Sequence, residues 1–299
     1  MLFRQLEYFV ALARERHFAR AADACYVSQP ALSEAIRKLE RELKVPLVLR
    51  GSSFQGLTPE GDRLVIWARR ILADRDALEH EVAAMRVGLT GELRLGVVPA
   101  AATRLALLID PFCNQHPLVR VRADTSLRST DIIDRIHRFE LDAGLIYTDG
   151  VDLTGLAITE LYEERHVLVG GAALLGTHDP VTWSDVATLP MCLLHKGMRG
   201  RDRVDEAARE HDVTLTPRLE TDSVATLLAL VETGRWASVV PAGWFAATRR
   251  PPGTRIVELD GSALRAPVAL VRAAGDPASV LAQALDVVAR SGPPPAATR

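Results

Sequence analysis

Three polar side chains near the N-terminus are the residues best suited to hydrogen-bonding chemistry. Gln29, Ser33 and Arg37 supply an amide, a hydroxyl and a guanidinium, which together offer both donors and acceptors. Residues four apart lie one above another on the same face of a helix. The sequence therefore predicts a polar edge that is either solvated or presented to a polar partner.

That edge belongs to a predicted helix that begins after Ser28. Ser28 is a favourable N-cap, and Pro30 stands in the first turn, where its missing N–H group costs nothing. The opposite face is an apolar stripe with helical spacing, which must be buried. Its members are Leu32, Ile36, Leu39 and Leu43.

Two short helices are predicted before this one, the first around Leu6, Phe9, Val10 and Ala13 and the second from about Phe18 to Cys25, so the three form a helix-turn-helix arrangement. After it, Leu47–Leu49 and Gly56–Thr58 flank a polar turn, a pattern typical of a two-stranded wing. Residues 1–58 carry nine Lys or Arg against six Asp or Glu, whereas the whole chain has a net charge of −2. This small local excess of positive charge is compatible with a nucleic-acid partner but is weak evidence for one.

Several motifs in this region resemble those of the LysR-type transcriptional regulators. The matching residues are Leu6-Glu7-Tyr8-Phe9, Ala21-Ala22, Val27 to Ser33, Ile36, Leu39-Glu40 and Leu57-Thr58-Pro59-Glu60-Gly61. The match is dense over the first 61 residues and looser to about residue 290. The resemblance implies an α+β multidomain chain: an N-terminal winged helix-turn-helix, a long linker helix and a two-lobed α/β effector domain of the periplasmic-binding-protein-like kind.

The resemblance also implies that the third helix reads DNA. Gln29 is suited to adenine, Arg37 to guanine or a phosphate, and Lys38 to a phosphate, because these side chains match those acceptors and donors. Arg50 matches the family's usual wing arginine, although the rest of the wing turn, Gly51 to Gln55, lacks the basic residues common there. The predicted DNA-binding set is Gln29, Pro30, Ser33, Arg37, Lys38, Arg50 and Thr58.

A linker helix is predicted over residues 60–90. From Glu60 to Val87 only Gly61 interrupts an otherwise helix-compatible run, and apolar residues recur at intervals of seven. Such a stripe favours pairing with a second copy of the chain. The alternative is a helix that lies across its own effector domain. The predicted dimerisation residues are Leu64, Trp67, Ile71, Leu78, Val82 and Met85.

From Gly91 onward, short apolar runs alternate with helical patterns, as in βαβ units. We expect an effector domain over 91–291, with lobe I at about 91–162 and 268–291, lobe II at about 163–267, and a flexible tail at 292–299. Helix N-termini at the cleft between the lobes favour anions, although Ala100 replaces a hydroxyl residue common in the family. The predicted effector-binding residues are Pro99, Ala100, Ala101, Thr103, Ser129, Thr130, Tyr147, Thr148, His195, Arg199 and Thr221. Helix capping alone also explains Ser129, Thr130 and Thr221.

Other function classes find little support. The sequence contains no nucleophile elbow, phosphate-binding loop or zinc-protease motif, so we expect neither catalysis nor a cofactor. Cys25, Cys113 and Cys192 are far apart, which argues against a disulfide framework and a metal site. We expect a cytoplasmic homodimer or homotetramer that binds promoter or operator DNA and a small-molecule effector. The effector is either an anion or a less polar ligand. The remaining rival is a cytoplasmic small-molecule-binding protein that does not read DNA.

Overall fold

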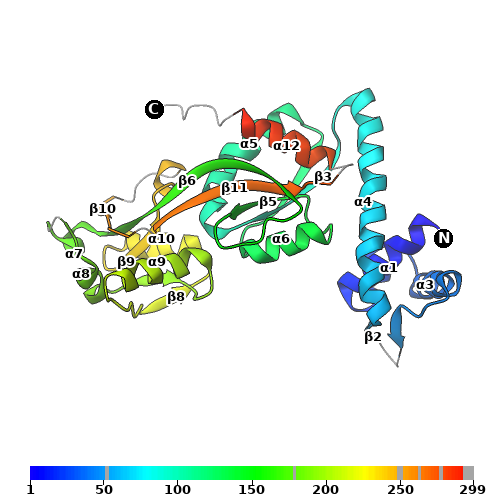
Figure 1. The fold of residues 1–299 in the computed structure, drawn as a ribbon, viewed down its shortest axis with the longest axis horizontal. Helices are drawn as coiled ribbons and strands as arrows, with labels where there is room; N and C mark the ends of the chain where they lie inside the picture. Colours follow the sequence, from blue (N-terminus) through cyan, green and yellow to red (C-terminus); the bar gives the residue numbers. More distant parts are fainter. Residues whose placement is uncertain (51–53, 178–179, 248–251, 262–263, 276–278, 292–299) are drawn as a thin grey trace. The chain divides into compact units, whose positions relative to one another are not determined.

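The computed structural model describes residues 1–50, 54–177, 180–247, 252–261, 264–275 and 279–291 (Figure 1). The chain divides into two compact units. The first comprises Met1–Leu89 with His137–Glu140 and Asp276–Val280, and the second comprises the remainder. The predicted tail, 292–299, lies outside the described residues.

The first unit begins with three helices, α1 (Phe3–Glu15), α2 (Phe18–Ala24) and α3 (Gln29–Leu43). As the sequence predicts, α3 begins after Ser28, whose hydroxyl accepts a hydrogen bond from the Ala31 N–H group at 3.4 Å. Strands β1 (Val48–Arg50) and β2 (Phe54–Leu57) then pair antiparallel, as a wing requires. The stripe of α3 is buried against α1 and α2 in a core that contains Leu6, Phe9, Leu12, Ala21, Ala22, Leu32, Ile36 and Leu39.

Gly61 fixes the contact between the wing and the next helix, and it yields a stability prediction. A Cβ at this position would stand 2.1 Å from the Leu47 carbonyl oxygen. The backbone has little room to move, because Thr58 bonds both the Gly61 N–H group at 2.9 Å and the Pro46 carbonyl at 2.7 Å. We expect Gly61→Ala to lower the free energy of unfolding by about 2 kcal/mol. Chemical denaturation checks this against Gly275→Ala, whose methyl group would meet nothing within 4 Å; equal losses would contradict it.

Helix α4 (Pro59–Val87) is the predicted linker, and its 29 residues span roughly 43 Å. Its apolar residues divide between two faces. Val65 and Ala68 are buried in the core of the first unit, and Leu64 and Ile71 pack against that core. Leu64 and Ile71 therefore contribute to the packing of the first unit, and their place in a dimer interface stays a prediction. Trp67, Leu78 and Val82 remain exposed, and the Met85 side chain lies outside the described part of the chain.

Lobe I of the second unit is built on a five-stranded sheet. Its strands are, in order, β4 (Val119–Asp124), β3 (Gly91–Val97), β5 (Ala143–Tyr147), β11 (Arg265–Ala273) and the first part of β6 (Leu156–Gly171). Its helical segments are η1 (Pro99–Arg104), α5 (Leu105–Gln115), α6 (Ser129–His137) and α12 (Val280–Arg290). The 3₁₀ segment η1 leads directly into α5.

Strand β6 continues from lobe I into lobe II. Residues Leu156 to Arg165 pair with β11, whereas His166 onward pairs with β9 (Ala237–Pro241) and β10 (Thr254–Glu258). Figure 1 shows β6 and β11 running side by side across the second unit. The change of partner lies close to the lobe boundary proposed from the sequence, which did not reveal that one strand of 16 residues crosses it.

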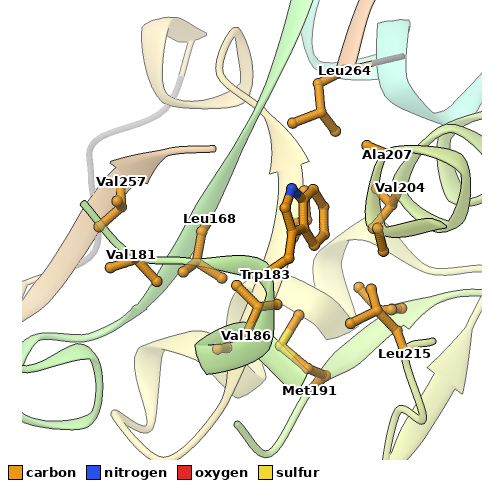
Figure 2. Close-up of a cluster of buried hydrophobic side chains, with 14 of the residues drawn as sticks. Leu168, Val181, Trp183, Val186, Met191, Val204, Ala207, Leu215, Val257 and Leu264 are labelled. Carbon is orange, nitrogen blue, oxygen red and sulfur yellow. The ribbon is translucent and has the colours of Figure 1, made fainter. Parts of the chain in front are cut away.

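Lobe II adds the parallel pair β7 (Cys192–Leu194) and β8 (Leu219–Thr221) and several helices. The helices are α7 (Ala172–Leu175), α8 (Trp183–Thr188), α9 (Arg199–Glu210), α10 (Val224–Glu232) and α11 (Trp244–Ala247). Trp183 lies in the main core of this lobe, where Leu168, Val204 and Leu264 surround it (Figure 2). Its indole N–H group donates to the Asp260 carbonyl at 2.6 Å. This core anchors α9, which carries several of the charged residues described below.

Within the described residues, no helix has the length and apolar character needed to cross a membrane. The same residues contain no cluster of three or more His, Cys, Asp or Glu side chains arranged to hold a metal ion.

Candidate functional site

The polar edge of α3 is accessible in the structure. Gln29, Pro30, Arg37 and Lys38 are exposed, and Ser33 is partly exposed, on the side opposite the buried stripe. The N-cap at Ser28 places Gln29 and Pro30 in the first turn of the helix. The structure thus brings the predicted residues of α3 onto one open surface, with the helix N-terminus at one end of it.

An acidic residue that the sequence analysis did not consider also lies on α3. The Glu34 carboxylate accepts a 2.7 Å hydrogen bond from the Arg41 guanidinium and lies 3.7 Å from the Arg37 guanidinium. Its charge offsets part of the positive charge that this surface presents to phosphates. The i, i+3 spacing of Glu34 and Arg37 was the available signal for this pair.

Because Glu34 pairs with Arg37 and Arg41, and the wing turn from Gly51 to Gln55 contains no Lys or Arg, DNA binding should depend weakly on salt. The slope of log affinity against log salt concentration measures the counterions released, at about 0.9 per phosphate contact. We expect a slope shallower than about −8 per dimer. Fluorescence anisotropy with operator DNA between about 50 and 200 mM salt measures it, and a steeper slope would contradict the prediction.

The wing predictions have mixed outcomes. Strands β1 and β2 are present, and Phe54 packs edge-on against Phe18 with ring centroids 6.2 Å apart. Gly51 to Ser53 and the Arg50 side chain lie outside the described residues. Thr58 is only 6% exposed, and its hydroxyl is engaged in the two internal bonds described above. Thr58 therefore positions α4 and the wing, and we leave it out of the DNA-contacting set.

In the second unit, a small pocket lies between the two lobes. Ala100 of η1 contributes from lobe I, and lobe II contributes the rest of the lining, which includes His166, Gly200, Arg201 and Trp244. The pocket has room for about one water molecule. The Trp244 indole N–H group donates to the Ala100 carbonyl at 2.8 Å, so this pair joins the lobes directly.

The other predicted effector-binding residues are distributed unevenly around this pocket. Pro99 and Ala101 are buried in η1, and Thr103 Oγ1 is buried without a hydrogen-bond partner. The Ser129 hydroxyl accepts from the Tyr147 N–H group at 3.2 Å, and the Thr221 hydroxyl accepts from Ser223. His195 and Thr130 are exposed and Thr148 is partly exposed. Of the predicted set, only Ala100 belongs to the pocket lining, while Tyr147 and Arg199 belong to the charged groups beside it.

A buried polar cluster stands beside the pocket, and sequence reasoning missed most of it. Glu164 accepts a short hydrogen bond from the Tyr147 hydroxyl, and His166 Nε2 lies 3.8 Å from its carboxylate. The Arg203 guanidinium stands over the Tyr147 ring at 5.1 Å. The alternation of Glu164, His166 and Leu168 along β6 was a usable signal, because alternate residues of a strand share a face.

Burial shifts the protonation equilibria of this cluster. Burial raises the pKa of Glu164 to about 7, although the Tyr147 hydrogen bond and the charges of Arg104 and Arg203 oppose the rise. Burial also lowers the pKa of His166 to about 4, so the imidazole is neutral near pH 7. The pKa of Tyr147 lies well above its ordinary value, first through burial and then through the Glu164 charge. These groups can therefore hold a proton in a low-dielectric environment between the lobes.

A second charged group links the lobes at the start of α9. Asp149, in the turn after β5, forms a 2.6 Å ion pair with Arg199 and a further ion pair with Arg203. Arg203 also donates to the Arg265 carbonyl at 2.9 Å. Burial alone would raise the pKa of Asp149, but the hydrogen bonds and charges of both arginines outweigh it and leave the pKa below its ordinary value.

Comparison with known proteins gives consistent matches over both units. Residues 3–62 match the family model for bacterial regulatory helix-turn-helix proteins of the lysR family, and residues 86–290 match the LysR substrate binding domain. The chain is 34% identical to the SDS degradation transcriptional activation protein of a Pseudomonas species, over 99% of both chains. It is 31% identical to the DNA-binding transcriptional dual regulator OxyR of Escherichia coli, over 81% of this chain and 79% of that protein.

Solved structures agree with these matches. A full-length OxyR variant from Pseudomonas aeruginosa superposes with a TM-score of 0.75 at 25% identity, covering 100% of this chain and 99% of that one. Full-length CbnR in complex with its target DNA gives a TM-score of 0.67 at 23% identity, with coverage of 97% and 99%. The latter similarity supports the fold alone.

Proposed function

Since the chain belongs to the LysR family and is a DNA-binding transcriptional regulator with an effector-binding domain, we propose that the exposed edge of α3 selects its operator. The observation that carries this proposal is the opposition of two faces on one helix. Gln29 and Arg37 are exposed, while Leu32, Ile36 and Leu39 are fully buried behind them. A helix with this division can present its N-terminal side chains to base edges in the major groove.

The proposed contacts divide into two kinds. Gln29, Ser33 and Arg37 read base edges, whereas Lys38 and the wing arginine Arg50 neutralise phosphates. Pro30 shapes the first turn of α3 and contributes apolar contact. A mobility-shift assay with the DNA upstream of this chain's own gene tests the proposal. Binding that survives excess unrelated DNA is expected, and binding that unrelated DNA removes would contradict it.

We also propose that the protein works as a homodimer or homotetramer, with the exposed residues of α4 in the interface between copies. Trp67, Leu78 and Val82 are 48% or more exposed, although each is large and apolar. An apolar face on a helix this long is well suited to pairing with a second copy. Paired reading heads would bind two half-sites whose spacing follows from the dimer geometry.

The effector is proposed to bind between lobe I and lobe II, beside Ala100 and Trp244. Arg199 and Arg203, together with the N-terminus of α9, favour an anionic group, so we propose a small organic acid. Binding would shift the population of lobe arrangements and thereby alter DNA affinity or half-site spacing. Calorimetry of the full-length protein with a panel of small acids and their neutral amides tests this; binding by amides but by none of the acids would contradict it.

Thiol chemistry is not part of the proposed response, although some relatives are named hydrogen peroxide-inducible genes activators. Cys192 is buried, and burial raises the pKa of its thiol to about 11. A thiol with so little thiolate is a poor nucleophile towards oxidants. Cys113, on α5, and Cys192, on β7, belong to different lobes and are both free. We further propose that the protein has no catalytic role and acts in the cytoplasm.

A further inference from the structure

The strongest unassigned feature is the convergence of two arginines on one carboxylate across the lobes. Asp149 belongs to lobe I, and Arg199 and Arg203 stand one turn apart on the same face of α9 in lobe II. Both guanidinium groups contact the same oxygen, Oδ2 of Asp149. A pair of arginines around one carboxylate oxygen forms a site with the charge and geometry of an oxyanion receptor.

Asp149 fills this receptor incompletely. Its other oxygen, Oδ1, is buried and accepts no hydrogen bond, and the Nε atom of Arg199 is also buried without a partner. A buried polar atom without a hydrogen bond costs about 1–3 kcal/mol. A free carboxylate could bring both oxygens to the guanidinium groups, because it is not tethered to the turn after β5.

The turn that carries Asp149 lies close to Arg199. The next residue, Gly150, has a φ of +67°, and a Cβ there would stand 3.1 Å from the terminal NH2 nitrogen of Arg199. The turn therefore passes close beside the guanidinium in a conformation that side chains rarely adopt. Gly150 thus allows the Asp149 turn to approach the Arg199 guanidinium closely.

We infer that Asp149 is an internal substitute for the effector's carboxylate: it occupies the Arg199–Arg203 receptor, and a small organic acid must displace it to bind. This inference rests on the proposed anionic effector and adds the group that the effector competes with. Displacement would replace a contact between the lobes by a contact to the ligand. The acid would thereby release the ion pairs that connect the turn after β5 to α9.

The test is calorimetry of the full-length protein with sodium acetate and sodium benzoate, and with acetamide and benzamide as neutral counterparts. Asp149→Asn keeps the size of the side chain and removes its charge, so it should lower the Kd of the acids at least tenfold. Adding Arg199→Gln should abolish that gain. Asp205→Asn is the matched control, because it removes a carboxylate that pairs with Arg201 on the same helix and does not contact the receptor. This variant should leave the Kd of acetate and the Kd of benzoate unchanged.

Each outcome decides the inference. Equal acid affinity in the wild type and Asp149→Asn would overturn it while leaving the anionic effector intact. Failure of both acids to bind either protein would overturn it together with the anionic effector. An equal gain for the amides would also overturn it, since the effect would then come from looser lobes and not from charge. If Asp149→Asn does not fold, as judged by thermal unfolding, Asp149→Ser serves as the second variant with the same expected results.

Discussion

Replacing Gln29, Ser33 and Arg37 together by alanine is expected to lower operator affinity at least 100-fold while leaving binding to unrelated DNA nearly unchanged. Each good base contact is worth about 1–3 kcal/mol of discrimination, so losing two or three removes most of the specificity. The fold should survive, because Gln29 and Arg37 are exposed, Ser33 is only partly buried, and alanine favours a helix. Fluorescence anisotropy with operator and unrelated duplexes at one salt concentration measures both affinities.

The matched control is the pair Lys38→Ala and Arg41→Ala on the same helix. Both residues are exposed and basic, and both are suited to phosphates. Their removal should weaken binding to operator and to unrelated DNA by similar factors. If the triple variant were folded and kept the wild-type ratio of the two affinities, the assignment of base reading to this edge would be refuted.

Replacing Glu164 by glutamine is expected to change how the stability of the effector-binding domain depends on pH. The pKa of this buried acid is about 7 in the folded protein, above its ordinary value of 4.5. Between these values the folded state holds a proton that the unfolded state has released. Stability contributed by the protonated acid is therefore present below pH 4.5 and is lost as the pH rises to about 7.

His166 contributes the opposite slope. Its pKa is about 4 in the folded protein against 6.5 ordinarily, so the unfolded state binds the extra proton between these values. The contribution of His166 to the unfolding free energy therefore rises with pH across that interval. In the wild type this rise largely offsets the fall that Glu164 causes. In Glu164→Gln only the His166 slope remains.

At about 1.4 kcal/mol per pH unit, the unfolding free energy of Glu164→Gln relative to wild type should increase by about 3 kcal/mol from pH 4.5 to pH 8. Chemical denaturation of the full chain at several pH values, followed by tryptophan fluorescence, measures this difference. Glu163→Gln is the control: Glu163 is the neighbouring residue on β6, but its side chain is 58% exposed in a surface pair with Arg265. A difference independent of pH in Glu164→Gln would show that the acid is not held neutral by burial.

Local signals explain what the sequence could predict. The start of α3 depends on Ser28 and Pro30, and its orientation depends on a stripe of residues within the same helix, so both could be inferred from neighbouring positions. The long α4 was predictable for the same reason. Its faces were not, because the spacing of Leu64 and Ile71 suits either a second copy or the core of the first unit. Their contact with the core of the first unit depends on how α4 packs against α1, which no local pattern reveals.

The arrangement of side chains between the lobes could not be predicted from local signals. Tyr147, Glu164 and Arg203 come from β5, β6 and α9, and no local pattern indicates that they meet. Helix starts were a reasonable guide to anion sites, yet the side chains of Ser129 and Thr221 form internal hydrogen bonds. The ion pairs of Asp149 with Arg199 and Arg203 depend on how the two lobes pack, which the sequence does not reveal. Contacts between strands and helices far apart in sequence therefore determine the candidate effector site.

A DNase I footprint of the full-length protein on the DNA upstream of its own gene tests most directly whether α3 reads sequence. We expect two protected half-sites whose centres are separated by a multiple of about 10 base pairs, because paired copies of α3 must face the same side of the duplex. Protection should persist in the presence of excess unrelated DNA. Uniform protection that disappears with that competitor, or no protection at concentrations that saturate binding, would contradict the claim that this chain reads sequence.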